Sequence, residues 1–312
     1  PPHKAVTNLY ADMDLNLLTT KDCRWITPVI HAHYGEWKAK PPTPPDRLTA
    51  DPHWHLKIDR VRQYNDVFAQ TEHMIREQKP KSRVFVWYGE EGQGVEIFHK
   101  RLLVELREGL SGVHVHQIRP RWPEHLEDYH SAFSHVLTEP FGVGAIEDIP
   151  GRLRKESHNR TTLLYVRHEP VRSDQLIDTE SLKDYVLWWD FEFAKLLEKK
   201  QFALLSVSFL VENPPKFAQD VHDENIEELN LKNTEFMLLD AMEKVAKTDL
   251  LRFLRTHNID LPEDRKDDAL QEIINRTDGR YEQTVEELKK LRKQAWRVIK
   301  KSGKKRLSGK KT

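Results

Sequence analysis

Short, continuous runs of apolar residues recur along this chain between more polar stretches. Such runs are typical of strands that are buried on both faces of a sheet. They occupy 84–88, 162–166 and 202–211, and 113–118 alternates between apolar and polar residues as a half-buried strand does. We therefore expect four strands in the first two thirds of the chain.

Apolar residues in the intervening segments repeat every three or four positions, which predicts amphipathic helices. These segments are 57–78, 97–106, 124–137 and 181–199. Strands that alternate with helices predict an α/β fold in three layers, with helices covering both faces of a parallel sheet.

The pattern changes after Asn213, Pro214 and Pro215, beyond which we expect only helices. Their predicted ranges are 225–246, 248–256, 264–276 and 281–300. Before residue 56 there is one possible strand, 25–30, and a stiff proline run, 41–45. The predicted parts are an extension with a Pro-rich linker (1–55), an α/β domain (56–222), a helical lid subdomain (223–300) and a basic disordered tail (301–312).

Charge is unevenly distributed although the 50 basic and 50 acidic residues cancel. Residues 289–312 hold 12 Lys and Arg and no acid, so residues 1–288 carry 38 bases and 50 acids, a net charge of −12. An acidic body with a basic end is a poor footprint for nucleic acid, except through the segment 289–312. The segment 301–312 has one large apolar residue, Leu307, and we expect it to be disordered and dispensable for folding.

Membrane and redox classes are disfavoured by composition. No apolar run approaches the ~18 residues of a membrane span, and the polar start has no apolar core of a signal peptide. The single Cys23 excludes an internal disulfide framework and suits a reducing compartment. These features predict a soluble, cytoplasmic protein without membrane partners.

A glycine-rich segment, 89–96, follows the strand 84–88 and precedes a helix, as a phosphate-binding P-loop does. A P-loop needs a Lys to neutralise the phosphates and a Ser or Thr to bind Mg²⁺. Val95 and Glu96 stand at those two positions, and Glu90 and Glu91 add negative charge. We therefore expect a tight turn without ATP or GTP hydrolysis, in which Gly89, Gly92, Gln93 and Gly94 form a vestigial nucleotide loop.

The strand 162–166 is the candidate for the metal-side acid of a P-loop ATPase. Arg167 and His168 stand near the position of that acid, and only Glu169 is acidic. The His-x-His pairs, His31/His33, His53/His55 and His114/His116, lack a third ligand that the sequence identifies. We predict no catalytic residue, no metal site and no cofactor.

The order of these motifs resembles the inactive STAND domains from about residue 57 to about 290. The resemblance rests on the helix 57–78, the loop 89–94 with Phe98, Arg101, Leu102 and Leu103, the strand 163–166 with His168, and the segments 249–253, 258–262 and 276–281. It implies a P-loop NTPase-like domain of prokaryotic conflict and regulatory systems whose nucleotide-binding residues have decayed. The function it implies is that of a non-catalytic adaptor for a protein effector in antiviral defence or signalling. A weak nucleotide-binding switch and an enzyme with an unrecognised site are the alternatives.

Two adjacent indoles, Trp188 and Trp189, lie in the predicted helix 181–199. Neighbours on a helix point about 100° apart, so both cannot enter one narrow apolar stripe. One exposed indole would be a candidate anchor for a protein partner, and packing under the helical subdomain is the alternative.

Overall fold

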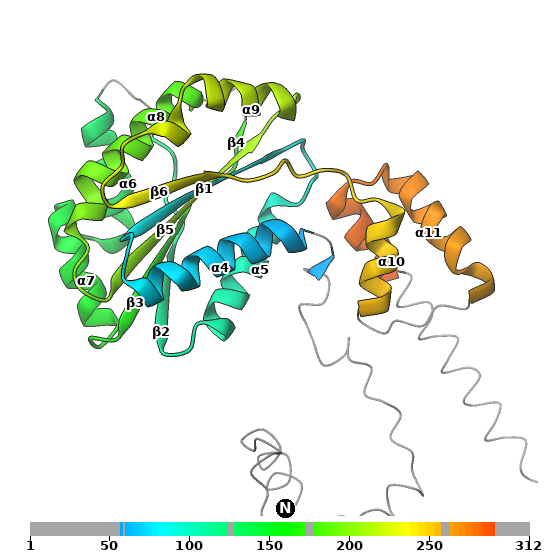
Figure 1. Ribbon diagram of the computed structural model, residues 1–312, viewed down its shortest axis with the longest axis horizontal. Coiled ribbons are helices and arrows are strands. Elements are labelled where there is room, and N and C mark those ends of the chain that lie inside the picture. The colour runs from blue at the N-terminus through cyan, green and yellow to red at the C-terminus, as the bar shows by residue number, and fades with distance from the viewer. Residues whose placement is uncertain (1–56, 59, 124–127, 173–176, 257–262, 291–312) are drawn as a thin grey trace, which may run out of the picture. The chain divides into compact units, whose positions relative to one another are not determined.

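The computed structural model describes residues 57, 58, 60–123, 128–172, 177–256 and 263–290 (Figure 1). Several predicted features lie outside these residues: the extension and its proline run, Cys23, two His-x-His pairs, the tail 301–312 and the segment 291–300. Among the described helices, none is long and apolar enough to cross a membrane.

The core of the fold is one parallel sheet. Its strands are β1 (Ser82–Gly89), β2 (Val113–Ile118), β3 (Thr161–Arg167), β4 (Val171–Arg172), β5 (Gln201–Leu210) and β6 (Thr234–Leu238). Their order is β2-β3-β5-β1-β6, with the short β4 beside the end of β5, and every pairing is parallel. The four predicted strands are confirmed to within two residues at each end.

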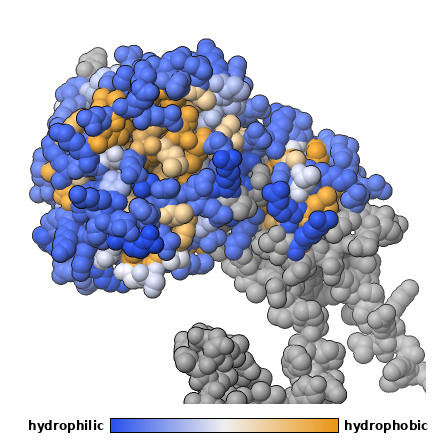
Figure 2. All heavy atoms as spheres, viewed as in Figure 1, coloured by the Kyte–Doolittle hydropathy of each residue, from blue (hydrophilic) through white to orange (hydrophobic). Residues whose placement is uncertain are grey.

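Helices cover both faces of this sheet, as predicted (Figure 1), and the sheet separates two apolar clusters. Successive side chains of a strand point to opposite faces, so Val84 and Val86 of β1 enter one cluster while Phe85 and Trp87 enter the other. The first face is covered by α6 (Tyr129–Phe141), α7 (Ile149–Glu156), α8 (Thr179–Trp188) and α9 (Pro214–Asp223), and the second by α4 (Val61–Glu77) and α5 (Val95–Gly109). Hydrophilic residues form most of the surface in Figure 2, with apolar residues gathered over one part of it.

The predicted helix over 225–246 is wrong. This segment contains a short 3-10 turn, Ile226–Glu228, and the edge strand β6, which pairs with β1. The apolar spacing resembles a helix because residues of β6 pack on both faces of the sheet, Phe236 and Leu238 on one and Met237 on the other. β6 therefore extends the sheet beyond residue 222, where we expected the α/β domain to end (Figure 1).

Two helices, α7 and α9, were not predicted, and each has a proline in its first turn. Pro150 and Pro214 lie in the first turn, where the missing N–H would have no helical acceptor. The Asn213 side chain caps α9 by accepting a hydrogen bond from Lys216 N at 3.1 Å.

The C-terminal part is helical, as predicted. α10 (Lys247–Thr256) and α11 (Glu263–Thr277) are followed by a helix over 281–290. The turn between α11 and the last helix has positive φ at Asp278 (51°) and Gly279 (67°), and Gly279 O accepts a hydrogen bond from Val245 N at 2.7 Å. This turn places the start of the last helix against the α/β domain.

Candidate functional site

The glycine loop connects the end of β1 to the start of α5. Gly92 and Gly94 adopt positive φ angles of 85° and 79°, which other residues reach only at a cost, and Gly94 is the N-cap of α5. The loop therefore has the strand-turn-helix geometry predicted from its glycines. It lies at the carboxyl edge of the parallel strands, where α/β proteins commonly bind ligands.

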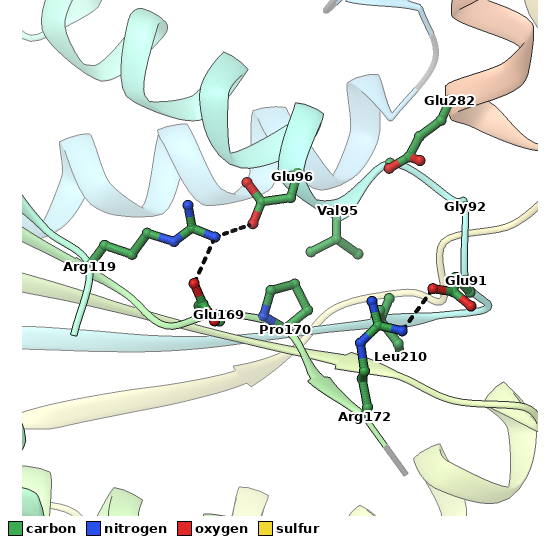
Figure 3. A pocket seen from close by; sticks show the side chains of 11 residues that line it. Glu91, Gly92, Val95, Glu96, Arg119, Glu169, Pro170, Arg172, Leu210 and Glu282 are labelled. Atoms are coloured by element: carbon green, nitrogen blue, oxygen red, sulfur yellow. Dashed lines mark hydrogen bonds and ion pairs between the residues drawn. The ribbon is translucent and has the colours of Figure 1, made fainter. Parts of the chain in front are cut away.

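A cavity of about 360 Å³ lies beside this loop (Figure 3). It is lined by residues of the loop, of α5, of the segments that follow β2 and β3, of β4, of the end of β5 and of the last helix: Glu91, Gly92, Gly94, Val95, Glu96, Arg119, Glu169, Pro170, Arg172, Leu210 and Glu282. Four carboxylates and two guanidinium groups therefore face one small space.

Most of these charges are paired with each other. Glu96 bonds the buried Arg167 and lies 3.0 Å from Arg119, which also lies 3.5 Å from Glu169 (Figure 3). Arg172 lies 2.8 Å from Glu91. In a P-loop the phosphate anion sits at the helix N-terminus. Here Glu96, in the first turn of α5, supplies the negative charge at that place from within the chain.

The position of the P-loop lysine is occupied by an apolar side chain. Val95 is 3% exposed and belongs to the apolar cluster beneath α4 and α5. It offers no positive charge to a phosphate. Gly89, Gly92, Gln93 and Gly94, which we expected to form a vestigial nucleotide loop, thus form a turn, and the two side chains after them provide neither a cation nor a hydroxyl.

The end of β3 likewise lacks an acid at the expected metal position. Arg167 is buried and bonds Glu96, and His168 is fully buried, stacked on Trp122 with ring centroids 3.8 Å apart. His168 Nε2 lies 2.8 Å from the Tyr185 hydroxyl. Burial lowers the pKa of His168 to about 3, against a smaller opposing effect of the Pro120 backbone, so the ring is neutral at pH 7.

A second buried histidine, His99 on α5, was not singled out from the sequence. Its ring nitrogens lie 2.7 Å from the Tyr165 hydroxyl and 2.7 Å from the Ser208 hydroxyl. Burial, reinforced by the charges of Arg167 and Arg119, holds the pKa of His99 well below its usual value. Since α5 packs its apolar stripe on the sheet, a polar residue within that stripe was the available signal.

The last helix covers the glycine loop. Glu282 N donates a hydrogen bond to Gly92 O at 3.1 Å, and the Tyr281 ring lies so close to Gly94 that a Cβ there would be 2.4 Å from Tyr281 Cδ1. Arg60, which is 4% exposed, lies with its guanidinium carbon 5.2 Å from the Tyr281 ring centroid. Its Nη2 donates to Glu243 O at 2.5 Å and to Gln93 Oε1 at 3.3 Å. Three segments that are distant in sequence, at Arg60, at Glu243 and at the start of the last helix, therefore meet at the loop.

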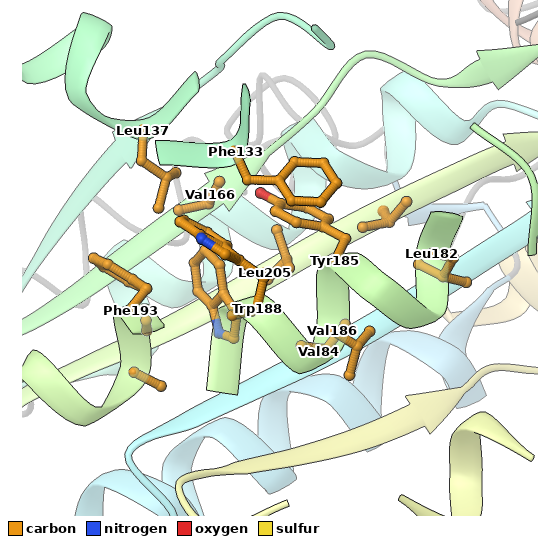
Figure 4. Close-up of a cluster of buried hydrophobic side chains, with 14 of the residues drawn as sticks. Val84, Phe133, Leu137, Val166, Leu182, Tyr185, Val186, Trp188, Phe193 and Leu205 are labelled. Atoms are coloured by element: carbon orange, nitrogen blue, oxygen red, sulfur yellow. The ribbon is translucent and has the colours of Figure 1, made fainter. Parts of the chain in front are cut away.

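The expectation that Trp188 or Trp189 is exposed is wrong. Trp188 is 6% exposed and packs on Phe133 and Tyr185 (Figure 4). Trp189 is fully buried, and its Nε1 donates to Ser82 Oγ at 2.6 Å. Both indoles are buried because they have different neighbours: Trp188 packs on Phe133 of α6, which covers the same face of the sheet, and Trp189 reaches Ser82 of β1. The role of the two residues in partner binding stays a prediction. The structure does not supply the exposed indole on which that prediction was based.

The exposed aromatic side chain of this segment is Phe191, at 39%. It lies in a π-helical turn, Trp189–Phe193, that continues α8. In the same turn the buried Asp190 accepts hydrogen bonds from Lys232 N at 2.9 Å and Asn233 N at 2.7 Å. The π-helical turn thus holds the residues just before β6 in place, and it leaves the Phe191 side chain exposed.

The histidine pair on β2 has partners other than a metal. The ring centroids of His114 and His116 are 6.4 Å apart, and His116 Nδ1 lies 3.2 Å from Glu156. His116 also stacks on Phe141 at 5.3 Å. Within the described ranges, no three His, Cys, Asp or Glu side chains are grouped so that they could hold a metal ion.

A family profile described as inactive STAND matches residues 55–211, just over half of the chain. The chain belongs to the inactive STAND family. The match covers the glycine loop, the strands β1 to β5 and the helices between them, and thus most of the residues on which the resemblance was based. Membership places the chain among NTPase-like modules described as inactive. No curated protein matches the chain.

Solved structures with a similar fold include ORC and Cdc6 proteins. A Drosophila ORC structure bound to DNA has 13% identity and a TM-score of 0.41, covering 75% of this chain and 57% of that one. The Aeropyrum pernix ORC2 protein in its ADP form has 14% identity and a TM-score of 0.42, covering 73% and 62%. Cdc6p from Pyrobaculum aerophilum has 11% identity and a TM-score of 0.39, covering 75% and 63%. The chain spans less than two thirds of each, and at these values none of their activities is transferred to it.

Proposed function

We propose that this inactive STAND protein is a non-catalytic module that acts by binding a protein effector, as an adaptor in a prokaryotic defence or signalling system. It would be a pseudo-NTPase that keeps the glycine turn of a P-loop and uses the α/β domain as a scaffold. In this role the protein acts without a nucleotide, a metal or another cofactor.

One observation carries the loss of catalysis. The first turn of α5, where a phosphate would be held, carries Glu96, and this carboxylate bonds Arg167 and lies 3.0 Å from Arg119. A triphosphate would have to displace an ion pair that includes a buried guanidinium and would then face the carboxylates of Glu91, Glu96, Glu169 and Glu282. Like charges at a few Å raise the energy of the complex, so hydrolysis is disfavoured at its binding step.

The adaptor role is supported by the surface of the protein, which is what a module without catalysis can still use. Without a catalytic group, such a module acts through contacts of its surface, and exposed aromatic side chains are the ones that most often anchor such contacts. Phe191 is the large apolar side chain that stands out from the described surface. The family resemblance supplies the class of partner, a protein effector.

Capture of partners tests this function. Tagged full-length protein would be used to capture proteins from the native host, and each captured protein would then be purified and titrated with and without Mg-ATP. We expect at least one direct partner whose Kd changes less than about twofold on adding nucleotide, well under the tenfold that 1.4 kcal/mol represents. Phe191→Ala, paired with a control substitution at the exposed Lys100, tests whether Phe191 belongs to the contact.

The alternative, a weak nucleotide-binding switch, is favoured by a different observation. The cavity beside the loop remains open, and two arginines, Arg119 and Arg172, line it. A switch would bind a partner at least about tenfold more tightly in one nucleotide state than in the other, since coupling of about 1–3 kcal/mol is typical of such devices. The same titration therefore separates the two functions.

A further inference from the structure

The edge strand β6 has one side that no other described strand covers. It pairs only with β1, and its alternate residues point their backbone groups toward that neighbour: Leu239 N donates to Val86 O at 3.1 Å, and Asn233 O accepts from Ser82 N at 3.0 Å. In an extended strand successive residues direct N–H and C=O to opposite sides. The backbone groups of Thr234, Phe236 and Leu238 therefore point away from the sheet.

The side chains on this edge are mostly apolar and partly exposed. Phe236 and Leu238 border one apolar cluster and Met237 borders the other. Figure 2 shows apolar residues gathered at the surface on the face where β6 lies. The exposed Phe191 adjoins this edge, since its ring centroid lies 5.8 Å from Nζ of Lys232, just before the strand.

The residues of β6 themselves, all of which the structure describes, lack the usual protection of an edge strand. Natural edge strands are guarded by prolines, free charges or bulges. β6 has no proline, and its one charged residue, Glu235, is bound to Arg83 at 2.6 Å. The other edge, β2, carries His114, His116 and Gln117 and holds an ion pair between His116 and Glu156. Of these two edges, β6 is thus the one suited to accept a strand.

We propose that a second copy of this chain pairs with β6 in antiparallel orientation, with Phe236 of both copies at the two-fold axis. This register pairs all three outward residues, Phe236 with Phe236 and Thr234 with Leu238, and would form about six backbone hydrogen bonds. On the other face it sets Glu235 opposite Met237, so no like charges are opposed. Phe236 and Leu238 of the two copies form one continuous apolar stripe.

A second copy fits better than an open series of copies. An assembly that joined β6 to β2 would be head-to-tail and could grow without limit, whereas β6 on β6 is isologous and closes as a dimer. The polar β2 edge disfavours the first arrangement. The dimer concerns assembly alone, so its failure would leave the proposed adaptor function untouched.

Complementary charge variants of the full-length protein test this pairing. In a Phe236→Lys variant, as in a Phe236→Glu variant, two like charges would face each other at the axis, while a mixture of the two variants would bring opposite charges together. Molar mass would be measured by sedimentation and light scattering over a concentration series, with circular dichroism and melting to show that each variant folds. Gln117→Lys, on the β2 edge, is the matched control.

We expect the wild type and Gln117→Lys to be dimers, each Phe236 variant to dissociate with a Kd raised at least ~tenfold, and the mixture to restore the dimer. A wild type that is monomeric at every concentration overturns the proposal and leaves the edge to a strand of another protein. A dimer that survives Phe236→Lys overturns it as well, since its interface would lie elsewhere. Folded variants that fail to pair when mixed would exclude the Phe236 register.

Discussion

At the scale of single residues, Gly94 is the position at which the glycine loop leaves no room for a side chain beside Tyr281 of the last helix. Gly94→Ala combines an unfavourable φ of 79° with a Cβ 2.4 Å from Tyr281 Cδ1. Gly112 has a similar φ of 75° but nothing within 4 Å of an added Cβ, so Gly112→Ala isolates the backbone cost. We expect Gly112→Ala to lower the free energy of unfolding by about 1–2 kcal/mol and Gly94→Ala by at least ~1 kcal/mol more. Equal losses in urea denaturation would show that Tyr281 does not pack on the loop.

The ion pairs of the cavity allow the stability of two variants to be compared, one at a nearly buried pair and one at an exposed pair. Glu96 is partly exposed, but its partner Arg167 has a side chain only 5% exposed, so Glu96→Ala leaves a nearly buried cation without its carboxylate. We expect a loss of about 1–3 kcal/mol, below the ~3–5 kcal/mol of a fully buried pair because water still reaches Glu96. Glu91→Ala breaks only the exposed pair with Arg172 and should cost about 0–1 kcal/mol. The two losses would be measured by urea denaturation at low salt, and a larger loss for Glu91→Ala would contradict the assignment.

The low pKa of the buried His168 makes the free energy of unfolding depend on pH. Its pKa is about 3 in the folded protein and close to the ordinary 6.5 when unfolded, so the unfolded chain binds the extra proton first. The contribution is fully present above about pH 6.5 and is lost as the pH falls toward 3, by up to ~1.4 kcal/mol per pH unit. His168→Gln should reduce the slope of unfolding free energy between about pH 4.5 and 6 by about that amount. The exposed His222, changed to Gln, is the control, and an unchanged slope in His168→Gln would contradict a buried neutral ring.

The sequence alone could give some of these residues but not their contacts. Val95 and Glu96 were recognisable because a P-loop fixes which side chains must stand after its last glycine. Arg60 and Tyr281 were not, since they reach the loop from opposite ends of the described chain and only tertiary packing brings them together. Their residue types carry no motif by themselves.

At the scale of elements, the burial of the aromatic residues in α8 and its π-helical turn indicates which of them stabilise the fold. Trp188→Ala and Trp189→Ala should each lower the free energy of unfolding by about 3–5 kcal/mol, because each empties a large volume of the core. Phe191→Ala, in the same turn but 39% exposed, should change it by less than about 0.5 kcal/mol. Urea denaturation of the three variants provides the comparison. A small loss for either tryptophan would restore it as a candidate contact of the partner.

The elements themselves were predictable where their pattern was local. The strands β1, β2, β3 and β5 were found because short apolar or alternating runs bounded by turn residues are typical of strands, and α4 and α5 because their buried faces repeat regularly. β6 was missed because its apolar residues fit a helical repeat as well, and its pairing with β1 is a long-range contact. Pro214 marks a change of pattern in the sequence, although a proline in the first turn is compatible with a helix such as α9.

At the scale of the whole molecule, the described part of the chain joins its α/β domain to its C-terminal helices through the glycine loop. In the sequence this loop pointed to a decayed nucleotide site, and in the structure Tyr281, Glu282 and Arg60 contact it directly. The parallel sheet and the position of the loop between a strand and a helix were predictable from the order of motifs, but the strand order and β6 were not. A helical lid over 223–300 was predicted as well, but its contacts with the loop through Tyr281 and Glu282 were not, because they depend on where the last helix packs.

Calorimetric titration of the full-length protein with Mg-ATP and Mg-GTP, paired with a phosphate-release assay, tests the central claim most directly. The account predicts no saturable binding at Kd below about 1 mM and no phosphate release above buffer. Arg119→Glu, which changes a cavity residue, should give the same result as the wild type. Saturable binding of the wild type at about 10 μM or tighter that is lost in Arg119→Glu would contradict the claim and establish a working nucleotide site at the loop.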